Sequence, residues 1–208
     1  MDRRVLIDWL RLFSRNPSII KYFLEWRKSL KEGRNSLTDR IPWIVYESKE
    51  WLDRHLQRRM KVFEWGSGGS TIYLSKRVKV LVSIEHDSDW FQKVKSALKK
   101  GKVKTIKYYL IKPELKKKLV SFEKYCNFIN RFENNLFDLI IVDGRSRNLC
   151  IKKAIPKIRR RGFLLLDNSE RREYKKGMRF INNWERKDFY GPGPYNSYFW
   201  QTSIFQKP

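Results

Sequence analysis

Residues 62–71 have the sequence Val62-Phe63-Glu64-Trp65-Gly66-Ser67-Gly68-Gly69-Ser70-Thr71, in which an apolar run is followed by three glycines within four positions. The pattern predicts a strand that ends at Glu64, a tight turn, and a helix that begins near Ser70. Glycine in such a turn lets the backbone adopt a positive φ angle and approach a ligand closely. We therefore interpret the stretch as a ligand-binding turn between a strand and a helix.

Short apolar runs alternate with helical stretches from residue 61 onward. The runs lie at 61–65, 80–86, 104–111, 137–143 and 162–168, and the predicted helices between them at 71–77, 88–100, 113–132 and 148–160. Continuously apolar strands that alternate with helices are typical of an α/β fold whose parallel sheet is covered on both faces. The chain ends differently, because the turn-rich stretch 191–198 leads into a strand at 199–205 with no helix after it. A strand that enters by a hairpin runs antiparallel to its neighbour.

Residues 1–40 are predicted to form a helical extension that precedes an α/β domain of residues 41–208. Two apolar stripes lie on either side of the break at Asn16-Pro17, one formed by Leu6, Ile7, Trp9, Leu10 and Phe13, the other by Ile19, Ile20, Phe23, Leu24 and Trp26. Lys and Arg residues lie between the apolar residues of both stripes. The favoured interpretation is that the stripes pack on the fold and the charges are solvated. Peripheral contact of these helices with an anionic membrane is the alternative.

The composition restricts the class of protein. The chain has 208 residues, with 47 Lys and Arg against 22 Asp and Glu and a net charge of +25. The hydrophobic share of 41% excludes global disorder, and two Cys and two His exclude a disulfide framework or a Cys-rich zinc module. No apolar run approaches a membrane span, and the first residues lack the features of a signal peptide, so we expect a cytoplasmic protein. The positive charge predicts a polyanionic partner such as nucleic acid, an anionic membrane face or an acidic glycan.

Two carboxylates flank the glycine turn and discriminate between cofactors. A nicotinamide-type G-x-G-x-x-G fingerprint would require a glycine where Thr71 stands. Glu64 would repel a pyrophosphate, whereas a cationic sulfonium ligand with an α-amino group would be attracted to it. Glu85, at the end of the next strand, can accept both hydroxyls of a ribose. The pair therefore favours S-adenosylmethionine over a nicotinamide dinucleotide.

The segments FEWGSGGST (63–71) and SIEHD (83–87) resemble the cofactor motifs of class I S-adenosylmethionine-dependent methyltransferases. The resemblance covers residues 60–208 and implies a seven-stranded Rossmann-like sheet, mostly parallel, with the last strand inserted antiparallel. Ser70 replaces the third glycine of the family's G-x-G-x-G motif, and Gly69 is displaced by one position. The predicted cofactor-binding residues are Glu64, Gly66, Ser67, Gly68, Ser70, Thr71, Glu85 and His86. For Asp87 and Trp90 two interpretations stay open, contact with the nucleoside or a helix cap and core packing.

Polar residues follow two further strands, and they predict the position of the catalytic site. Asp143 ends one strand, and Asp167 and Asn168 end the next, so their oxygens should lie close together at the carboxyl edge of the sheet. Oxygen ligands suit Mg²⁺, and the set resembles that of metal-dependent catechol-type O-methyltransferases. Without a metal, Asp143 is the predicted general base. Arg145 is predicted to hold a substrate carboxylate or phosphate, while Arg147 is interpreted as a partner of Asp143 or Asp167.

The methyl acceptor is less defined than the cofactor. The chain lacks the N-P-P-Y-type loop that enzymes methylating nucleic-acid amines carry after the fourth strand. We therefore favour an oxygen acceptor on a small molecule or a glycan. The basic runs at 99–118 and 151–180 keep an RNA methyltransferase as an alternative, if aromatic side chains among the cations are exposed for base stacking. A basic nucleic-acid or membrane-surface binding module without catalysis is the non-enzymatic alternative.

Overall fold

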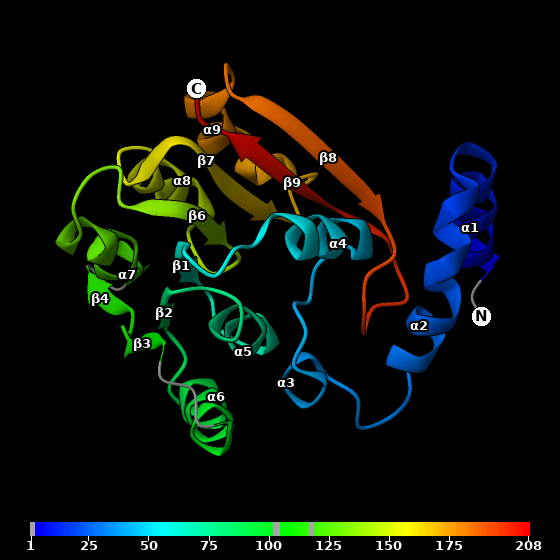
Figure 1. Ribbon diagram of the computed structural model, residues 1–208, viewed down its shortest axis with the longest axis horizontal. Coiled ribbons are helices and arrows are strands. Elements are labelled where there is room, and N and C mark those ends of the chain that lie inside the picture. The colour runs from blue at the N-terminus through cyan, green and yellow to red at the C-terminus, as the bar shows by residue number, and fades with distance from the viewer. Residues whose placement is uncertain (1–2, 102–104, 117–118) are drawn as a thin grey trace.

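Strand β1 (Lys61–Trp65) is an inner strand of a seven-stranded sheet with the order β3-β2-β1-β6-β7-β9-β8 (Figure 1). The computed structural model describes residues 3–101, 105–116 and 119–208. The other strands are β2 (Val80–Glu85), β3 (Ile106–Leu110), β6 (Phe137–Val142), β7 (Ile158–Asp167), β8 (Glu185–Gly191) and β9 (Trp200–Gln206). β9 pairs antiparallel with both β7 and β8, while β1, β2, β3, β6 and β7 are parallel. The predicted α/β sheet with an inserted antiparallel last strand is confirmed.

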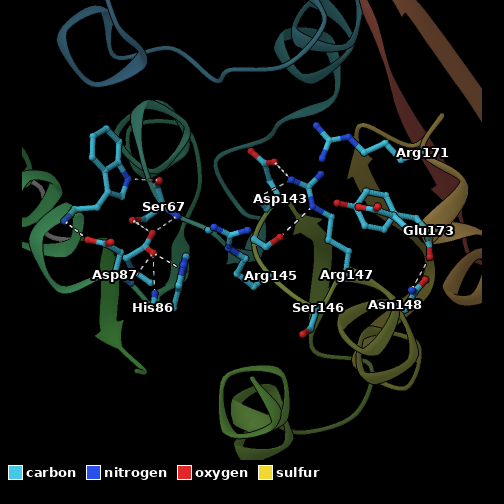
Figure 2. Close-up of a pocket in the computed structure, with 15 residues that line it drawn as sticks. Ser67, His86, Asp87, Asp143, Arg145, Ser146, Arg147, Asn148, Arg171 and Glu173 are labelled. Atoms are coloured by element: carbon cyan, nitrogen blue, oxygen red, sulfur yellow. Dashed lines mark hydrogen bonds and ion pairs between the residues drawn. The ribbon is translucent and has the colours of Figure 1, made fainter. Parts of the chain in front are cut away.

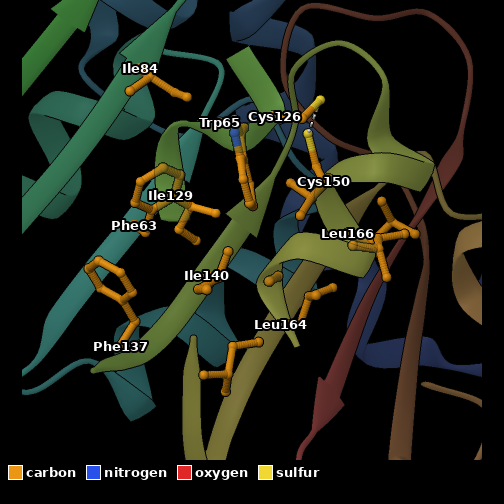
Figure 3. Close-up of a cluster of buried hydrophobic side chains, with 14 of the residues drawn as sticks. Phe63, Trp65, Ile84, Cys126, Ile129, Phe137, Ile140, Cys150, Leu164 and Leu166 are labelled. Atoms are coloured by element: carbon orange, nitrogen blue, oxygen red, sulfur yellow. Dashed lines mark hydrogen bonds between the residues drawn. The ribbon is translucent and has the colours of Figure 1, made fainter. Parts of the chain in front are cut away.

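The core lies on both faces of this sheet, because successive side chains of a strand point to opposite faces. In β1, Val62 belongs to one buried cluster, whereas Phe63 and Trp65 belong to the other. The Phe63 cluster also contains Cys126 and Cys150, which are both buried (Figure 3). Cys150 is therefore a packing residue. Burial on both faces explains why the inner strands β2 and β6 are largely apolar.

Helices cover the two faces of the sheet. The Val62 face carries α4 (Tyr46–His55) and α5 (Gly69–Ser75), and the Phe63 face carries α7 (Glu123–Asn127) and α8 (Arg147–Ala154). Helix α6 (Ser88–Lys100) packs through Val94 and Leu98 against Ile72 of α5. The remaining short helices on the second half of the chain are α9 (Lys175–Met178) and the 3-10 turns at Phe128–Arg131, Arg172–Tyr174 and Arg179–Ile181.

Two predicted helices differ from the structure. Segment 113–132 begins as the antiparallel hairpin of β4 (Glu114–Lys116) and β5 (Leu119–Ser121) before α7 starts. Leu115 and Leu119 have helical spacing, but they are 80% and 73% exposed, so no apolar surface holds them in a helix. The helix predicted over 148–160 ends at Ala154, because Pro156 lacks an N–H group to continue it, and Ile158 already belongs to β7.

The N-terminal segment contains α1 (Arg3–Arg15), a 3-10 turn (Pro17–Ile20), α2 (Lys21–Ser29) and α3 (Ser36–Asp39). Trp9, Ile19 and Trp26 form a buried cluster with Tyr46 and Phe199, which attaches these helices to the rest of the chain. Other members of the predicted stripes, among them Leu10 and Leu24, are exposed. The packing interpretation therefore holds for only part of each stripe. The domain boundary at residue 40 stays a prediction.

The basic run at 99–118 is only partly covered by the structure. Lys102, Lys104, Lys117 and Lys118 lie outside the described residues, as does the first residue of the strand predicted over 104–111. Among the described helices, none combines the length and the hydropathy that crossing a bilayer requires.

Candidate functional site

The turn after β1 brings the backbone of three strands together. Gly66 has a φ angle of +88°, and a Cβ atom there would lie 2.9 Å from the carbonyl oxygen of Asp143. The Gly66 N–H donates to the carbonyl of Ile84 at 3.0 Å, and the Asp143 N–H donates to that of Trp65 at 3.0 Å. Only glycine combines this φ angle with so close a contact, so Gly66 holds the turn at the point where the strand order reverses.

Gly69 has a different role from the other glycines of the turn. A Cβ atom on Gly69 would lie 1.9 Å from the carbonyl oxygen of Ser36 and 2.3 Å from that of Ile41. On Gly68 it would meet nothing closer than the Ser36 Oγ atom at 3.6 Å. The displaced glycine of the motif therefore permits close packing of segment 36–41 on the start of α5.

Glu85 closes the turn on the side of β2. Its carboxylate is 3% exposed and accepts hydrogen bonds from Ser67 N at 3.0 Å, Ser67 Oγ at 2.8 Å, His86 N at 2.7 Å and Asp87 N at 3.0 Å. Burial alone would raise the pKa of Glu85, but these donors and the adjacent His86 ring outweigh it and hold the pKa at about 2. Glu85 is therefore a fixed anion at the cavity wall, as expected of a residue that accepts hydroxyl groups.

Glu64 lies behind the turn and is completely buried. Its Oε2 atom accepts hydrogen bonds from Thr71 Oγ1 and Ser83 Oγ, both at 2.7 Å. Its Oε1 atom is buried without a partner among the described residues. Burial raises the pKa of Glu64 to about 7 despite these hydrogen bonds. A carboxylate oxygen left without a donor fits the approach of a cationic group from the turn.

Asp87 and Trp90 fulfil parts of both interpretations. Asp87 caps α6 by accepting a hydrogen bond from the Trp90 N–H at 2.7 Å. The Trp90 indole N–H donates to the carbonyl of Ser67 at 2.8 Å, which fixes the glycine turn to α6. Both residues also line the cavity, so they are structural and accessible to a ligand at once.

A cavity of about 640 Å³ opens beside the turn (Figure 2). Its first half is formed by the turn and the end of β2, and its second half by the loops after β6 and β7. The lining residues are Gly66, Ser67, Glu85, His86, Asp87, Trp90, Asp143, Gly144, Arg145, Ser146, Arg147, Asn148, Arg171, Glu173 and Tyr174. Of the residues predicted for the cofactor, Gly66, Ser67, Glu85 and His86 line it. Glu64, Gly68, Ser70 and Thr71 support the turn from behind.

Arg147 joins the loops after β6 and β7. Its guanidinium donates to the Asp143 side chain at 2.9 Å, to the Gly144 carbonyl at 3.0 Å and to the Asp167 carbonyl. The side chain is buried and lies over the ring of Tyr174. Arg147 is thus the partner of Asp143, as its interpretation from the sequence states.

The residues predicted for Mg²⁺ do not fit a metal. The cationic guanidinium of Arg147 already contacts Asp143 and lies 3.4 Å from Asn168 Oδ1. Asp167 Oδ1 accepts hydrogen bonds from Trp200 Nε1 at 2.9 Å and Thr202 Oγ1 at 2.6 Å, and Asn168 has a φ angle of +51° that turns the chain. Within 3–101, 105–116 and 119–208, no cluster of three or more His, Cys, Asp and Glu is arranged to hold a metal ion. The Mg²⁺ prediction is not supported, because the Arg147 guanidinium occupies the position between Asp143 and Asn168 that the ion would take.

Asp167 is buried, whereas the Asp143 side chain is 31% exposed at the cavity. Burial raises the pKa of Asp167, and repulsion by Asp143 adds to the effect. Burial also raises the pKa of Asp143, against the opposing attraction of Arg147. Both carboxyl groups therefore bind a proton more readily than an exposed aspartate does.

A second cavity of about 290 Å³ adjoins the first, since Asp143 and Arg171 line both. Its remaining walls are Trp43, Asp167, Asn168, Asn196, Tyr198 and Trp200. Trp43 and Tyr198 are 44% and 53% exposed, so their rings are available to a ligand. Trp43 also makes an edge contact with Tyr195 at 5.6 Å between ring centroids.

Several of these residues are missed by the sequence interpretation. Arg171 lies four residues beyond Asp167, and a position so soon after a strand end indicates a place at the site. The sequence does not single it out, because many other Lys and Arg residues surround it in the basic run 151–180. Trp43, Asn196 and Tyr198 come from distant parts of the chain, and no local pattern joins them. Arg145 is exposed at the cavity, and no ion pair of its guanidinium is found among the described residues.

Comparison with known proteins supports the fold. No protein-family model and no curated protein matches the sequence. A methyltransferase-like protein from Silicibacter pomeroyi aligns over 76% of this chain and 83% of its own, with 23% identity and a TM-score of 0.56. The tRNA (m1A58) methyltransferase of Aquifex aeolicus aligns over 80% and 71%, with 14% identity and a TM-score of 0.55. TYW2 of M. jannaschii, solved in complex with AdoMet, aligns over 77% and 74%, with 13% identity and a TM-score of 0.52.

The chain has the class I methyltransferase fold. The strand order and the antiparallel β9 agree with this assignment. At these levels of identity the likeness concerns the fold, and the activity has to be argued from the site.

Proposed function

We propose that the protein is an S-adenosylmethionine-dependent methyltransferase that methylates an oxygen of a small molecule or glycan. The observation that carries the proposal is the buried anion Glu85, fixed beside the Gly66 turn on the wall of a 640 Å³ cavity. The fold places this cavity at the switch point of the sheet, where ligands bind in open α/β proteins.

Glu85, Ser67 and His86 would hold the ribose end of the cofactor. The Ser67 hydroxyl donates to Glu85 Oε2 and lies 2.7 Å from the Tyr108 hydroxyl. Rotation of this one side chain would therefore open a position on Oε2 for a ribose hydroxyl, beside the Ser67 N–H that also donates to this oxygen. Glu64 would supply negative potential on the side of the amino acid. When bound, S-adenosylmethionine supplies an electrophilic methyl group on a sulfonium centre.

The second cavity is proposed to receive the acceptor. It joins the cofactor cavity at Asp143 and Arg171, and its volume of about 290 Å³ suits one ring-sized group. Trp43 and Tyr198 offer aromatic faces to such a ring, while Asn168 and Asn196 offer hydrogen bonds to its substituents. Arg145, at the junction, is proposed to hold a carboxylate or phosphate of the acceptor.

Asp167 is proposed to take the proton of the acceptor hydroxyl, in place of the Asp143 that the sequence favours. Asp143 is engaged by Arg147, whereas Asp167 lines the second cavity and is held by Trp200 and Thr202 through Oδ1 alone. A carboxylate whose pKa is raised by burial accepts a proton more readily than an ordinary one. Asp143 stays in place as the anion that orients Arg147.

Calorimetry with S-adenosylmethionine tests cofactor binding. We expect binding by the wild-type chain and a loss of roughly thirtyfold or more in affinity for Glu85→Ala, because a hydrogen bond to a charged group is removed. Glu173→Gln, at the far end of the same cavity, serves as the matched control and should bind as the wild type does. Absence of binding at millimolar cofactor would reject the proposal.

Methyl transfer from labelled cofactor to glycan, lipid and RNA extracts tests the reaction. Asp167→Asn should slow transfer by about a hundredfold or more while leaving the affinity for the cofactor unchanged. Because Asp167 has to be deprotonated, the wild-type rate should rise with pH through the raised pKa of this group, and the variant should lose that dependence. An unaltered rate for Asp167→Asn would exclude it as the base. EDTA should have no effect on an active preparation.

RNA is the second candidate acceptor, because the exposed Arg145 and Arg171 lie at the cavity and a structural neighbour is a tRNA methyltransferase. RNA affinity should then fall steeply with salt, since neutralised phosphates release counterions. A flat salt dependence would reject this candidate. The cytoplasmic location stays a prediction.

A further inference from the structure

The N-terminal helices expose more apolar surface than their packing uses. On α1, Val5 and Trp9 are buried, whereas Leu6, Leu10 and Phe13 are 44%, 60% and 43% exposed. The exposed three are spaced at i, i+4 and i+7, so they form one row beside the buried row. In the segment that follows, Ile20 and Leu24 are 53% and 67% exposed at i, i+4 spacing. We call these five side chains, Leu6, Leu10, Phe13, Ile20 and Leu24, the outer row.

Basic residues accompany the outer row. Residues 3–31 contain eight Lys and Arg against two acidic residues. Arg11, Arg15, Arg27 and Lys28 are exposed, and no ion pair of their side chains is found among the described residues. Lys21 forms an ion pair in which its Nζ atom lies 2.7 Å from Glu50 Oε1. A helix with an apolar row and unpaired cations is suited to the boundary between lipid headgroups and acyl chains.

The composition of this surface discriminates between occupants. A second copy of the chain would bring the same cations together, on a molecule whose net charge is already +25. RNA would be recognised through stacking, but four of the five outer-row side chains are aliphatic. An anionic bilayer satisfies both requirements, because it takes up apolar side chains and attracts Lys and Arg.

We propose that the outer row and its flanking cations dock this protein on an anionic membrane surface. The contact is peripheral, since none of the described helices meets the requirements of a membrane span. It goes beyond the proposed methyl transfer and does not depend on it, because none of these residues lines either cavity.

The docking helices are held firmly to the body of the protein. The Trp26 indole donates to the Asn196 carbonyl at 2.8 Å, and Ser29 Oγ accepts a hydrogen bond from the Tyr195 N–H at 3.1 Å. Trp9 makes an edge contact with Phe199 at 5.4 Å between centroids. Figure 1 shows α1 and α2 beside the loop that joins β8 to β9, whose residues Asn196 and Tyr198 form part of the second cavity. Docking would therefore fix the orientation of the whole molecule on the bilayer.

Co-sedimentation of the full chain with vesicles tests the proposal. Vesicles of phosphatidylcholine with one third phosphatidylglycerol should bind the protein, and pure phosphatidylcholine vesicles should bind it at least about tenfold more weakly. The double variant Leu10→Ser/Leu24→Ser should partition on the order of a hundredfold less, because each Leu loses its transfer into the apolar layer. Arg11→Gln and Arg15→Gln should each weaken binding about fivefold.

Leu115→Ser is the matched control. Leu115 is 80% exposed, and it lies on the β4–β5 hairpin, far in the sequence from α1 and α2. It should bind vesicles as the wild type does. Circular dichroism should give unchanged melting for all variants, because the substituted side chains are exposed. The proposal is overturned if the wild type stays in the supernatant, if the double variant binds equally, or if Leu115→Ser alone abolishes binding. A dimer in sedimentation velocity that Leu10→Ser dissociates would assign the outer row to a second copy instead.

Discussion

Two glutamates at this site have similar positions in the sequence but very different pKa values. Glu64 is the last residue but one of β1 and Glu85 the last of β2, yet the pKa of Glu64 is raised to about 7 and that of Glu85 is lowered to about 2. Burial acts on both carboxyl groups. Glu85 receives two further backbone N–H groups from the turn after β2, whereas Glu64 has an oxygen without a donor. Backbone donors therefore decide which carboxylate stays ionised before a ligand arrives.

The buried Glu64 predicts that the free protein loses stability as pH rises. Its folded pKa of about 7 lies above the value of 4.5 for an exposed Glu, so the folded state binds the proton more tightly. Unfolding free energy should consequently fall by about 1 kcal/mol between pH 6 and pH 8, and Glu64→Gln should remove this part of the decline. Denaturant unfolding at both pH values measures it. Identical pH dependence in the two proteins would contradict the prediction, and Glu173→Gln is the exposed control.

At the scale of elements, contacts between segments explain the departures from the expected motif. Gly69 stands one position away from the third glycine of the resembled motif, and its hydrogen faces the carbonyls of Ser36 and Ile41. The short helix α3 and the turn after it thus rest directly on α5. Arg147 similarly connects the loops after β6 and β7, because its guanidinium donates hydrogen bonds to residues of both.

Alanine substitutions at neighbouring glycines should therefore have unequal effects. Gly69→Ala places a methyl group within 2.3 Å of two carbonyl oxygens and should destabilise the protein by about 2 kcal/mol or more. Gly68→Ala meets its first neighbour at 3.6 Å and should change stability by less than about 1 kcal/mol. Thermal unfolding without cofactor compares them. Equal losses would show that α3 does not rest on α5 as described.

The whole molecule carries a charge of +25 with a sequence pI near 10.2, and the two cavities are nevertheless associated with acidic side chains. Glu64, Glu85, Asp143 and Asp167 lie in or behind the cavities, while the cations are mostly at the surface. Such a surplus repels itself in the compact state and attracts anionic partners. We therefore propose that the surface charge affects which anionic partners the protein binds.

Self-repulsion predicts that salt stabilises this protein. Raising NaCl from 10 to 100 mM shortens the screening length from about 30 Å to about 10 Å. The melting temperature at pH 7 should rise by about 3 °C, which corresponds to about 1 kcal/mol for a chain of this size. Repeating the titration at pH 10, close to the pI of 10.2, is the control, since the rise should largely vanish there. A melting temperature that falls with salt at pH 7 would contradict the prediction.

The sequence by itself determined most of the sheet and the turn, and it predicted the class of ligand. Strands buried on both faces must be continuously apolar, and the glycine turn and the acidic strand ends are local patterns, so Gly66, Ser67, Glu85 and His86 could be located without a structure. The hairpin at 114–121 could not, because Leu115 and Leu119 have helical spacing but no surface to cover.

Only the tertiary structure decided which groups contact the predicted catalytic carboxylates. Asp143, Asp167 and Asn168 do converge, but a guanidinium from Arg147 fills the space that Mg²⁺ was predicted to take. The second cavity likewise joins Trp43 to Tyr198 across most of the chain. The physical reason is the same in both cases. Local patterns specify which groups lie at a strand end, while their partners, and hence their charge and accessibility, come from segments that only folding brings together.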